Sequence, residues 1–208
     1  MLFIAHRINT INELKNIPSN YGVEVDVRDK NQKLILQHDP FKEGEDFEEY
    51  LQHYHHTFII LNIKSERIEF RILELLKKYT ITRYFFLDSS FPMIYQLSQQ
   101  GECNNALRFS EYEGLDTIYL AQTRVRWIWV DCFSHLPLTK PIFSKLKATN
   151  LKICLVSPEL QGRDKDIEQY KTYLHKNNFI CDAICTKIYN ISRWQDATCS
   201  IMQGCSNK

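Results

Sequence analysis

The stretch TFIILNIKSERIEFRILELLKKYTITRYFFLD (residues 57–88) contains the pattern that decides the fold. Its two ends, 57–64 and 83–88, are rich in β-branched and aromatic residues, which is typical of strands. Between them, apolar residues follow the i, i+4, i+7, i+8 spacing that gives a helix one apolar stripe. These residues are Ile68, Ile72, Leu75, Leu76 and Tyr79. The pattern predicts two parallel strands joined by a helix whose stripe packs against the sheet.

The same alternation of strand and helix continues along the chain. Apolar β-type runs predict nine strands, and apolar stripes or capping residues predict the helices. The predicted strands are 2–6, 22–27, 33–38, 57–64, 83–88, 105–110, 126–131, 151–157 and 182–187. The predicted helices are 9–16, 47–54, 68–79, 89–101, 111–122, 140–150 and 166–178, the last capped by Asp164 or Asp166.

The number of strands favours a closed barrel. If 33–38 is the returning arm of a hairpin after 22–27, eight principal strands remain, which is the number in a (β/α)8 TIM barrel. The predicted fold class is therefore α/β, a small TIM barrel in which the first two helices, 9–16 and 47–54, are reduced. An open doubly wound sheet is the alternative. Polar residues at the carboxyl ends of the strands favour the barrel.

Length and composition limit the classes of protein that fit. The 208 residues, 44% of them apolar, suit one domain over 1–194, followed by a polar tail over 195–208 without hydrophobic periodicity. A net charge of +1 gives no overall field to hold a nucleic acid, and the six glycines form no Gly-rich phosphate loop. No apolar run approaches the roughly 18 residues that span a bilayer, and no signal peptide precedes His6. We therefore expect a small-molecule partner, no nucleic acid, no stable membrane insertion and a cytoplasmic protein.

The seven cysteines are odd in number, and several lie in apolar runs, where Cys behaves as a small hydrophobe. Cys181 and Cys185 look like a redox or metal pair. On a strand, however, they lie about 13 Å apart, beyond the reach of a disulfide. We expect buried structural thiols, which suit a reducing compartment.

Three pairs of polar residues interrupt the early apolar strands. They are His6 with Arg7, Glu24 with Asp26, and Asn62 with Lys64. Two carboxylates at i and i+2 of a strand share a face, where they repel each other unless a cation lies between them. Hard oxygen ligands of this kind suit Mg²⁺ or Ca²⁺, and the amide of Asn62 adds a neutral oxygen. Lys64 adds a positive charge for a bound anion.

His38 and Asp39 follow the next apolar run and bring a second imidazole to the same end of the barrel. Two histidines beside a divalent cation form a general acid/base pair next to an electrophile. Each signal alone also has a structural explanation. A histidine at a strand end is commonly a hydrogen-bonded structural residue, and an E-x-D pair is commonly the solvated face of an edge strand. The ordered combination is more specific.

Three motifs together have the order and spacing of a known signature. They are His6-Arg7, Glu24-x-Asp26 and His38-Asp39. Over residues 1–64 the chain resembles the glycerophosphodiester phosphodiesterase family, part of the wider superfamily of phosphatidylinositol-phosphodiesterase-like barrels. The resemblance implies that His6 and His38 form the acid/base pair. It also implies that Arg7 and Lys64 bind the phosphate.

The resemblance further implies a divalent cation held by Glu24, Asp26 and the residue at position 62. The match breaks at this last position, where the family carries a carboxylate and this chain has Asn62. An amide removes one negative charge from the ligands, which weakens the binding of Mg²⁺ or Ca²⁺. Asp88, at the end of the next strand, is a candidate for the missing charge. Ile8, where the family usually has glycine, is a second departure and predicts a phosphate loop that is bulkier or differently turned.

The later strand ends also carry polar groups, which meet at one mouth if the fold is a barrel. The possible substrate-binding residues are Asp88, Arg108, Asp131, Glu159 and Lys187. Trp127 and Trp129 are two apart on one strand, and filling of the core explains them better than stacking on a sugar. The loop 157–164 has the length and the mixed charges of a lid over the mouth.

The sequence thus predicts a hydrolase that cleaves a glycerophosphodiester-like or sugar-linked phosphodiester by two-histidine acid/base catalysis, assisted by a divalent cation. The alternative is a catalytically reduced barrel that binds a phosphorylated metabolite or polymer without turnover. Asn62 supports this alternative. The presence of both His6 and His38 opposes it, because a pure binding protein needs neither an acid nor a base.

Overall fold

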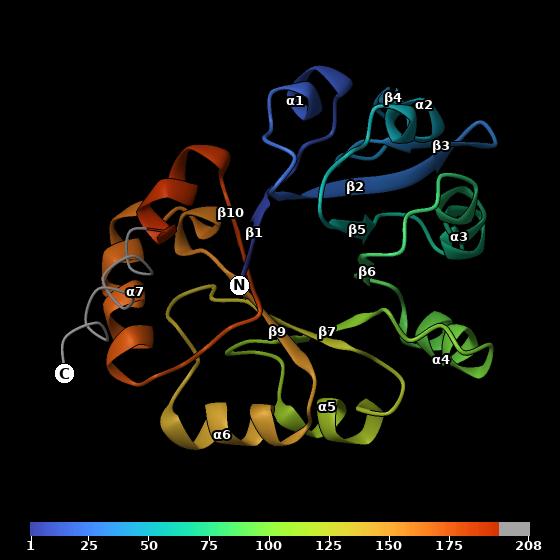
Figure 1. Ribbon diagram of the computed structural model, residues 1–208. Coiled ribbons are helices and arrows are strands. Elements are labelled where there is room, and N and C mark those ends of the chain that lie inside the picture. Colours follow the sequence, from blue (N-terminus) through green and yellow to red (C-terminus); the bar gives the residue numbers. More distant parts are fainter. Residues whose placement is uncertain (196–208) are drawn as a thin grey trace.

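Eight parallel strands form a barrel at the centre of the computed structural model, which describes residues 1–195 (Figure 1). Each strand pairs with the next around the ring, and the last pairs with the first. Between β6 and β7 the ring closes through a single bridge, Phe86 with Asn105. The strands are β1 (Leu2–Ala5), β2 (Gly22–Lys30), β5 (Ile59–Ile63), β6 (Tyr84–Leu87), β7 (Ala106–Phe109), β8 (Trp127–Val130), β9 (Lys152–Val156) and β10 (Ala183–Thr186). The predicted α/β barrel is confirmed.

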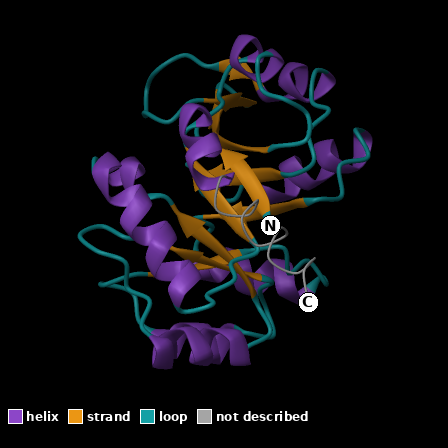
Figure 2. Ribbon diagram, turned by 60° about the vertical axis from the view of Figure 1, so that its left-hand side comes forward, coloured by secondary structure: helices purple, strands orange, loops and turns teal. Residues whose placement is uncertain are grey.

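The helices lie outside the strands (Figure 2). They are α1 (Ile11–Lys15), α2 (Phe47–Gln52), α3 (Glu69–Lys78), α4 (Phe91–Gln99), α5 (Leu115–Ala121), α6 (Lys140–Ala148) and α7 (Ile167–Lys176). The first two are short, as predicted, with five and six residues. Thr10 and Glu13 form a capping box that fixes the start of α1 despite its length.

The predicted cap of α7 is wrong. The helix begins after Asp166, but the carboxylate of Asp166 caps no backbone N–H group. It accepts a hydrogen bond from the guanidinium of Arg163 at 2.8 Å instead, and Asp164 accepts from Arg193. A charge-assisted bond to arginine is stronger than a bond to a neutral amide, so these arginines compete successfully for both carboxylates.

A hairpin inserted after β2 brings two loops to one edge of that strand. The strand β3 (Lys33–Leu36) runs antiparallel to β2, as predicted, and β4 (Glu45–Asp46) adds a short outer strand. The N–H of Gln37 donates to the carbonyl of Asp26, and the N–H of Ile8 donates to the carbonyl of Glu24. The loop that carries His38 and the loop that follows β1 therefore meet on the same edge of β2.

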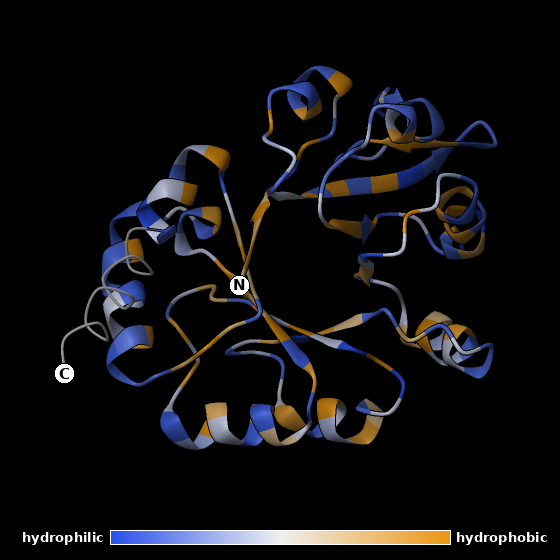
Figure 3. Ribbon diagram, viewed as in Figure 1, coloured by the Kyte–Doolittle hydropathy of each residue, from blue (hydrophilic) through white to orange (hydrophobic). Residues whose placement is uncertain are grey.

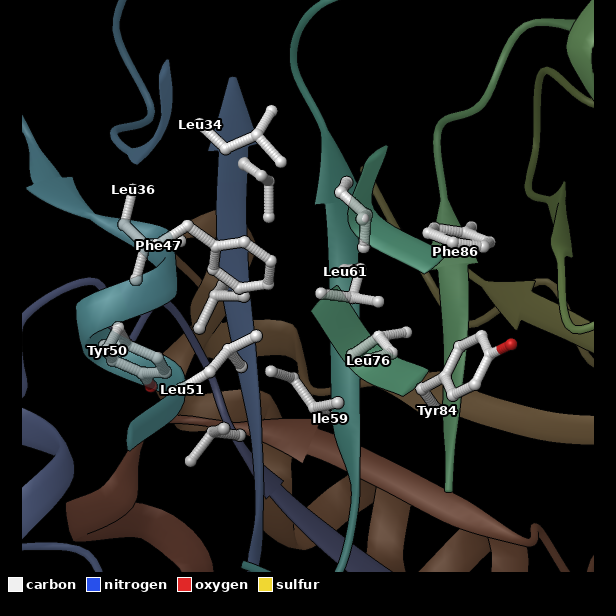
Figure 4. Packing of buried hydrophobic residues seen from close by; sticks show 14 of the residues in the cluster. Leu34, Leu36, Phe47, Tyr50, Leu51, Ile59, Leu61, Leu76, Tyr84 and Phe86 are labelled. Atoms are coloured by element: carbon white, nitrogen blue, oxygen red, sulfur yellow. The ribbon is translucent and has the colours of Figure 1, made fainter. Parts of the chain in front are cut away.

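Apolar side chains fill the inside of the barrel and the space between barrel and helices. In the ribbon of Figure 3, hydrophobic residues recur along the strands and alternate with hydrophilic residues on the helices. Trp127 and Trp129 are 3% and 4% exposed and belong to the inner cluster, which confirms their prediction as core residues. Outside the strands, side chains such as Phe47, Leu61 and Leu76 join β2 and β5 to α2 and α3 (Figure 4). The barrel is a packed core, so chemistry is confined to its ends.

Four of the cysteines, Cys132, Cys154, Cys181 and Cys185, are free and buried, as predicted for structural thiols, whereas Cys103 is free but only partly buried. Cys199 and Cys205 lie outside the described residues. Within residues 1–195, no helix has the length and apolar character to cross a membrane. The predicted tail over 195–208 lies outside the described residues except for Gln195.

Candidate active site

At the carboxyl end of the barrel, apolar inward-facing residues are followed two positions later by polar ones, which share their face. The pairs are Ile4 and His6, Ala106 and Arg108, Trp129 and Asp131, and Cys185 and Lys187. On β2 and β5 the change from apolar to polar residues occurs within the strands themselves, where Asp26 pairs with Asn62 in the strand register. Strands from all around the ring thus contribute polar groups to one mouth.

Glu24 is the centre of the hydrogen bonds in this mouth, and it is only 1% exposed. Its Oε1 accepts from Asn62 Nδ2 at 2.9 Å, and its Oε2 accepts from the backbone N–H of Arg7 at 2.7 Å. His6 Nε2 lies 3.7 Å from the same Oε2. Burial, followed by repulsion from Asp26, raises the pKa of Glu24 above its ordinary value.

Asp26, also 1% exposed, faces protein cations. Arg7 Nε lies 3.4 Å from its Oδ2, and Lys64 Nζ lies 3.5 Å from its Oδ1. Asn9 Nδ2 donates to Oδ2 at 2.8 Å, while the N–H of Asp26 donates to Asn9 Oδ1. The sequence analysis missed Asn9, because an asparagine in a loop carries no signal of the partner that the fold brings to it.

Arg7 has a backbone conformation that is uncommon for a side-chain-bearing residue, with a φ of 56°. This conformation aims its N–H at the buried carboxylate of Glu24, and the hydrogen bond to a charged acceptor offsets the strain. The loop after His6 therefore depends on Glu24 for its shape.

The side chains present fit a divalent cation poorly. Among residues 1–195, no group of three or more His, Cys, Asp or Glu side chains is arranged to hold a metal ion. Asn62 turns its amide N–H toward Glu24, and of the oxygens of Glu24, Asp26 and Asn62, those buried without a hydrogen bond are Asp26 Oδ1 and Asn62 Oδ1. Two oxygens are few for Mg²⁺ or Ca²⁺, which take six or more, and Lys64 lies beside one of them. The predicted cation at Glu24, Asp26 and Asn62 stays a prediction.

Asp88 does not supply the missing charge to this group. The guanidinium of Arg108 binds it through two hydrogen bonds of 2.7 and 2.8 Å, and Lys64 Nζ lies 3.8 Å away. The same guanidinium donates to Asp131 at 2.7 Å. Three residues from neighbouring strand ends therefore form one charged chain on the side of the mouth away from His6.

His6 is held as a neutral imidazole. Burial lowers its pKa to about 3, and the positive charges of Lys187, Arg7, Lys64 and His38 act in the same direction. Lys187 Nζ lies 3.1 Å from Nδ1, and because an ammonium only donates, Nδ1 is the acceptor and Nε2 carries the proton.

His38 reaches the mouth from the hairpin and is partly exposed, at 41% for its side chain. Its Nδ1 lies 2.8 Å from Asp39 Oδ1, and Arg28 donates to the carbonyls of Gln37 and His38. Arg28 thus fixes the loop while Asp39 orients the ring, which leaves Nε2 of His38 for a ligand. The structure brings both predicted histidines to one mouth.

The loop 157–164, predicted as a lid, is fastened to the barrel. It contains the short helical turn η1 (Pro158–Gln161). Glu159 accepts from the hydroxyl of Thr186 and, at 3.0 Å, from the N–H of Lys187, and Gln161 donates to Asp131 at 3.0 Å. Glu159 therefore holds the end of β10 in position.

Comparison of the sequence with protein-family models and with curated protein sequences finds no match. Solved structures do match the fold. A protein assigned as a glycerophosphoryl diester phosphodiesterase from Agrobacterium tumefaciens superposes with a TM-score of 0.70 at 12% identity, over 97% of this chain and 99% of that one. A phosphodiesterase from Oleispira antarctica, solved in complex with the product sn-glycerol-3-phosphate, gives 0.68 at 14% identity, over 95% and 96%.

A glycerophosphoryl diester phosphodiesterase from Parabacteroides distasonis gives a TM-score of 0.64 at 11% identity, over 96% of this chain and 86% of that one. These three structures are thus glycerophosphodiester phosphodiesterases with TIM-barrel folds, in agreement with the resemblance in the sequence. At identities of 11–14%, the likeness is one of fold.

Proposed function

We propose that the protein is a phosphodiesterase that hydrolyses a glycerophosphodiester-like or sugar-linked phosphodiester. The observation that carries the proposal is the placement of His6 at the carboxyl end of the barrel, 17% exposed, with Lys187 Nζ 3.1 Å from its Nδ1 and Arg7, Lys64 and His38 around it. TIM-barrel enzymes have their active sites at this end. The phosphodiesterases of similar fold, one of them bound to sn-glycerol-3-phosphate, support the same class of substrate.

The roles of the two histidines follow from their surroundings. His6 is the candidate to take a proton from an attacking hydroxyl, because Nδ1 carries no proton and a bound phosphate would offset the positive charges that lower its pKa. Asp39 orients the ring of His38 from 2.8 Å, so His38 is the candidate to give a proton to the leaving alkoxide. Arg7 and Lys64 neutralise the phosphate while negative charge develops on it. In the family that the sequence resembles, the attacking hydroxyl belongs to the substrate itself.

An assay on glycerophosphodiesters and on bis(p-nitrophenyl) phosphate tests the proposal. We expect His6→Ala and His38→Ala each to lower kcat by about 10²- to 10⁴-fold, the usual effect of removing a general acid or base. His175→Ala is the matched control, because His175 is exposed on α7, away from the mouth, and its loss leaves turnover unchanged.

Turnover that survives in both variants rejects the acid/base pair. Binding of phosphate by the wild type without turnover of any diester supports the alternative, a barrel that binds a phosphorylated metabolite or polymer. The amide at Asn62, which reduces the negative charge of the site, is the feature that favours this alternative.

A further inference from the structure

Lys187 is a cation of the mouth that lacks a carboxylate partner. Its Nζ lies 3.1 Å from His6 Nδ1, and its backbone N–H is held by Glu159 at 3.0 Å. Among the described residues, no carboxylate oxygen forms an ion pair with this ammonium, whereas Arg7 and Lys64 both face Asp26. Lys187 is partly exposed at the mouth, so its ammonium is accessible to a ligand, and a bound anion would give it the counter-ion that it lacks.

The charges around His6 suit an anion with one negative charge. Arg7 and Lys64 already face the buried carboxylate of Asp26, and Lys64 also lies 3.8 Å from Asp88. A phosphodiester carries one negative charge. Lys187 is the cation beside His6 that is left to pair with it, while Glu24 and Asp26 are already engaged by protein donors.

We propose that Lys187 binds the phosphate of the substrate and supplies the positive charge that a divalent cation would otherwise bring to this site. This inference rests on the proposed function for its substrate. Two features of the mouth support this proposal. The group formed by Glu24, Asp26 and Asn62 fits a metal ion poorly, and the ammonium of Lys187 has no carboxylate partner among the described residues. Asn62 removes a ligand charge, and Lys187 adds a cation to the same mouth.

Binding of the phosphate through Lys187 also releases the base. When the ammonium donates to a phosphate oxygen instead of to His6 Nδ1, the lone pair of Nδ1 becomes available. The proton of the attacking hydroxyl then moves to Nδ1 as the new O–P bond forms. The leaving alkoxide takes a proton from His38 as the old O–P bond breaks. Lys187 is thus a phosphate ligand whose movement couples binding to activation of His6.

Titration of inorganic phosphate into the full chain after treatment with EDTA tests the inference by calorimetry. We expect the wild type to bind phosphate, with an affinity that added Mg²⁺ or Ca²⁺ leaves unchanged. Lys187→Met should weaken the affinity by about 10- to 100-fold, the value of a charge-assisted hydrogen bond, and Lys187→Arg should recover most of it. Lys145→Met, at an exposed position on α6, is the matched control with unchanged affinity.

Phosphate binding that disappears in EDTA and returns with a divalent cation overturns the inference, as does wild-type affinity in a folded Lys187→Met. If circular dichroism shows that Lys187→Met does not fold, two other measurements test the inference. They are the phosphate affinity of Lys187→Arg and the phosphate affinity of the wild type in EDTA. A chain that binds phosphate through Lys187 but turns over no phosphodiester supports the inference and rejects the proposed function. Where turnover occurs, EDTA should leave kcat/KM unchanged, and Lys187→Met should raise KM and lower kcat together.

Discussion

At the scale of single residues, we expect Asn62 to set whether the mouth binds a divalent cation. Its amide donates to Glu24 at 2.9 Å, a bond that an aspartate cannot make. Asn62→Asp adds a third buried carboxylate, and we expect it to lower the free energy of unfolding by roughly 2–4 kcal/mol in EDTA, as for other unpaired buried charges. Mg²⁺ or Ca²⁺ should then raise the melting temperature of this variant and leave that of the wild type unchanged.

The control for this experiment is Asn12→Asp, the same change at an exposed position of α1. Thermal melts with EDTA and with each cation measure the effect. A wild type whose melting temperature rises with the cation as much as that of Asn62→Asp would show that Asn62 already serves as a metal ligand, in line with the cation predicted from the sequence.

Glu111 gives a prediction about pH. Its carboxylate accepts from the N–H groups of Phe133, Ser134 and His135 at 3.2, 2.6 and 2.9 Å, and so ties the loop after β7 to the loop after β8. Burial alone would raise the pKa of Glu111, but the hydrogen bonds from His135 and Ser134 outweigh it and lower the pKa from 4.5 to about 2. A lowered pKa in the folded state contributes stability above pH 4.5, and this stability is lost as the pH falls toward 2.

We therefore expect Glu111→Gln to lower the free energy of unfolding by about 1–3 kcal/mol near pH 6 and by much less near pH 3. Urea unfolding at both pH values measures the difference, with Glu49→Gln, exposed on α2, as the control. An equal loss of unfolding free energy at both pH values would mean that the negative charge of Glu111 does not contribute to stability.

At the scale of elements, the weakest part of the barrel is the contact between β6 and β7, which is a single bridge. Asn105 forms this bridge with its backbone, but its side chain is 0% exposed and neither its nitrogen nor its oxygen has a hydrogen-bond partner. Asn105→Leu keeps the size of the side chain and removes a buried amide, so we expect a gain of about 1–2 kcal/mol in the free energy of unfolding.

The control for the β6–β7 contact is Asn104→Leu. The side chain of Asn104 hydrogen-bonds to the hydroxyl of Tyr84, so the same change should destabilise the protein at this position. Urea unfolding compares the two variants. A loss of stability in Asn105→Leu would indicate that the amide of Asn105 binds an ordered water molecule.

The elements themselves were predictable, because periodicity and capping are local. The stripe from Ile68 to Tyr79 and a capping serine at the start of 89–101 predicted α3 and α4 within a few residues, and the structure shows that Ser90 is the cap. The competition of Arg163 for Asp166 was not predictable, since it depends on a residue brought close by the fold. The same holds for the contact of Lys187 with His6, which joins residues 181 positions apart.

At the scale of the whole molecule, the site exists only when the ring is closed. His6 follows the first strand and Lys187 the last, and the pairing of β1 with β10 brings them together. The sequence predicted the barrel from its strand count, and therefore predicted that the strand ends would meet. It did not predict which cations would face which carboxylates, because side-chain pairing in the mouth depends on register and on the inserted hairpin.

The packing of the barrel predicts a single cooperative unfolding transition. One outer cluster draws on the first half of the chain and another on the second half, but the inner cluster joins residues from Ile4 to Cys185. Trp127 and Trp129 report on this inner cluster by fluorescence, and far-UV circular dichroism reports on all helices and strands. We expect both signals to change at the same urea concentration.

Trp194 belongs to the second outer cluster and donates its indole N–H to Ser157 Oγ at 2.8 Å, so it adds a signal from that half alone. Trp194→Phe removes this signal, and fluorescence then comes from Trp127 and Trp129 inside the barrel. The variant should unfold at a lower urea concentration, because it loses a buried hydrogen bond worth about 1 kcal/mol, but still in one step by both methods. A dichroism transition that precedes the fluorescence transition would mean that the first half unfolds by itself across the single bridge between β6 and β7. The prediction of one domain over 1–194 would then be wrong.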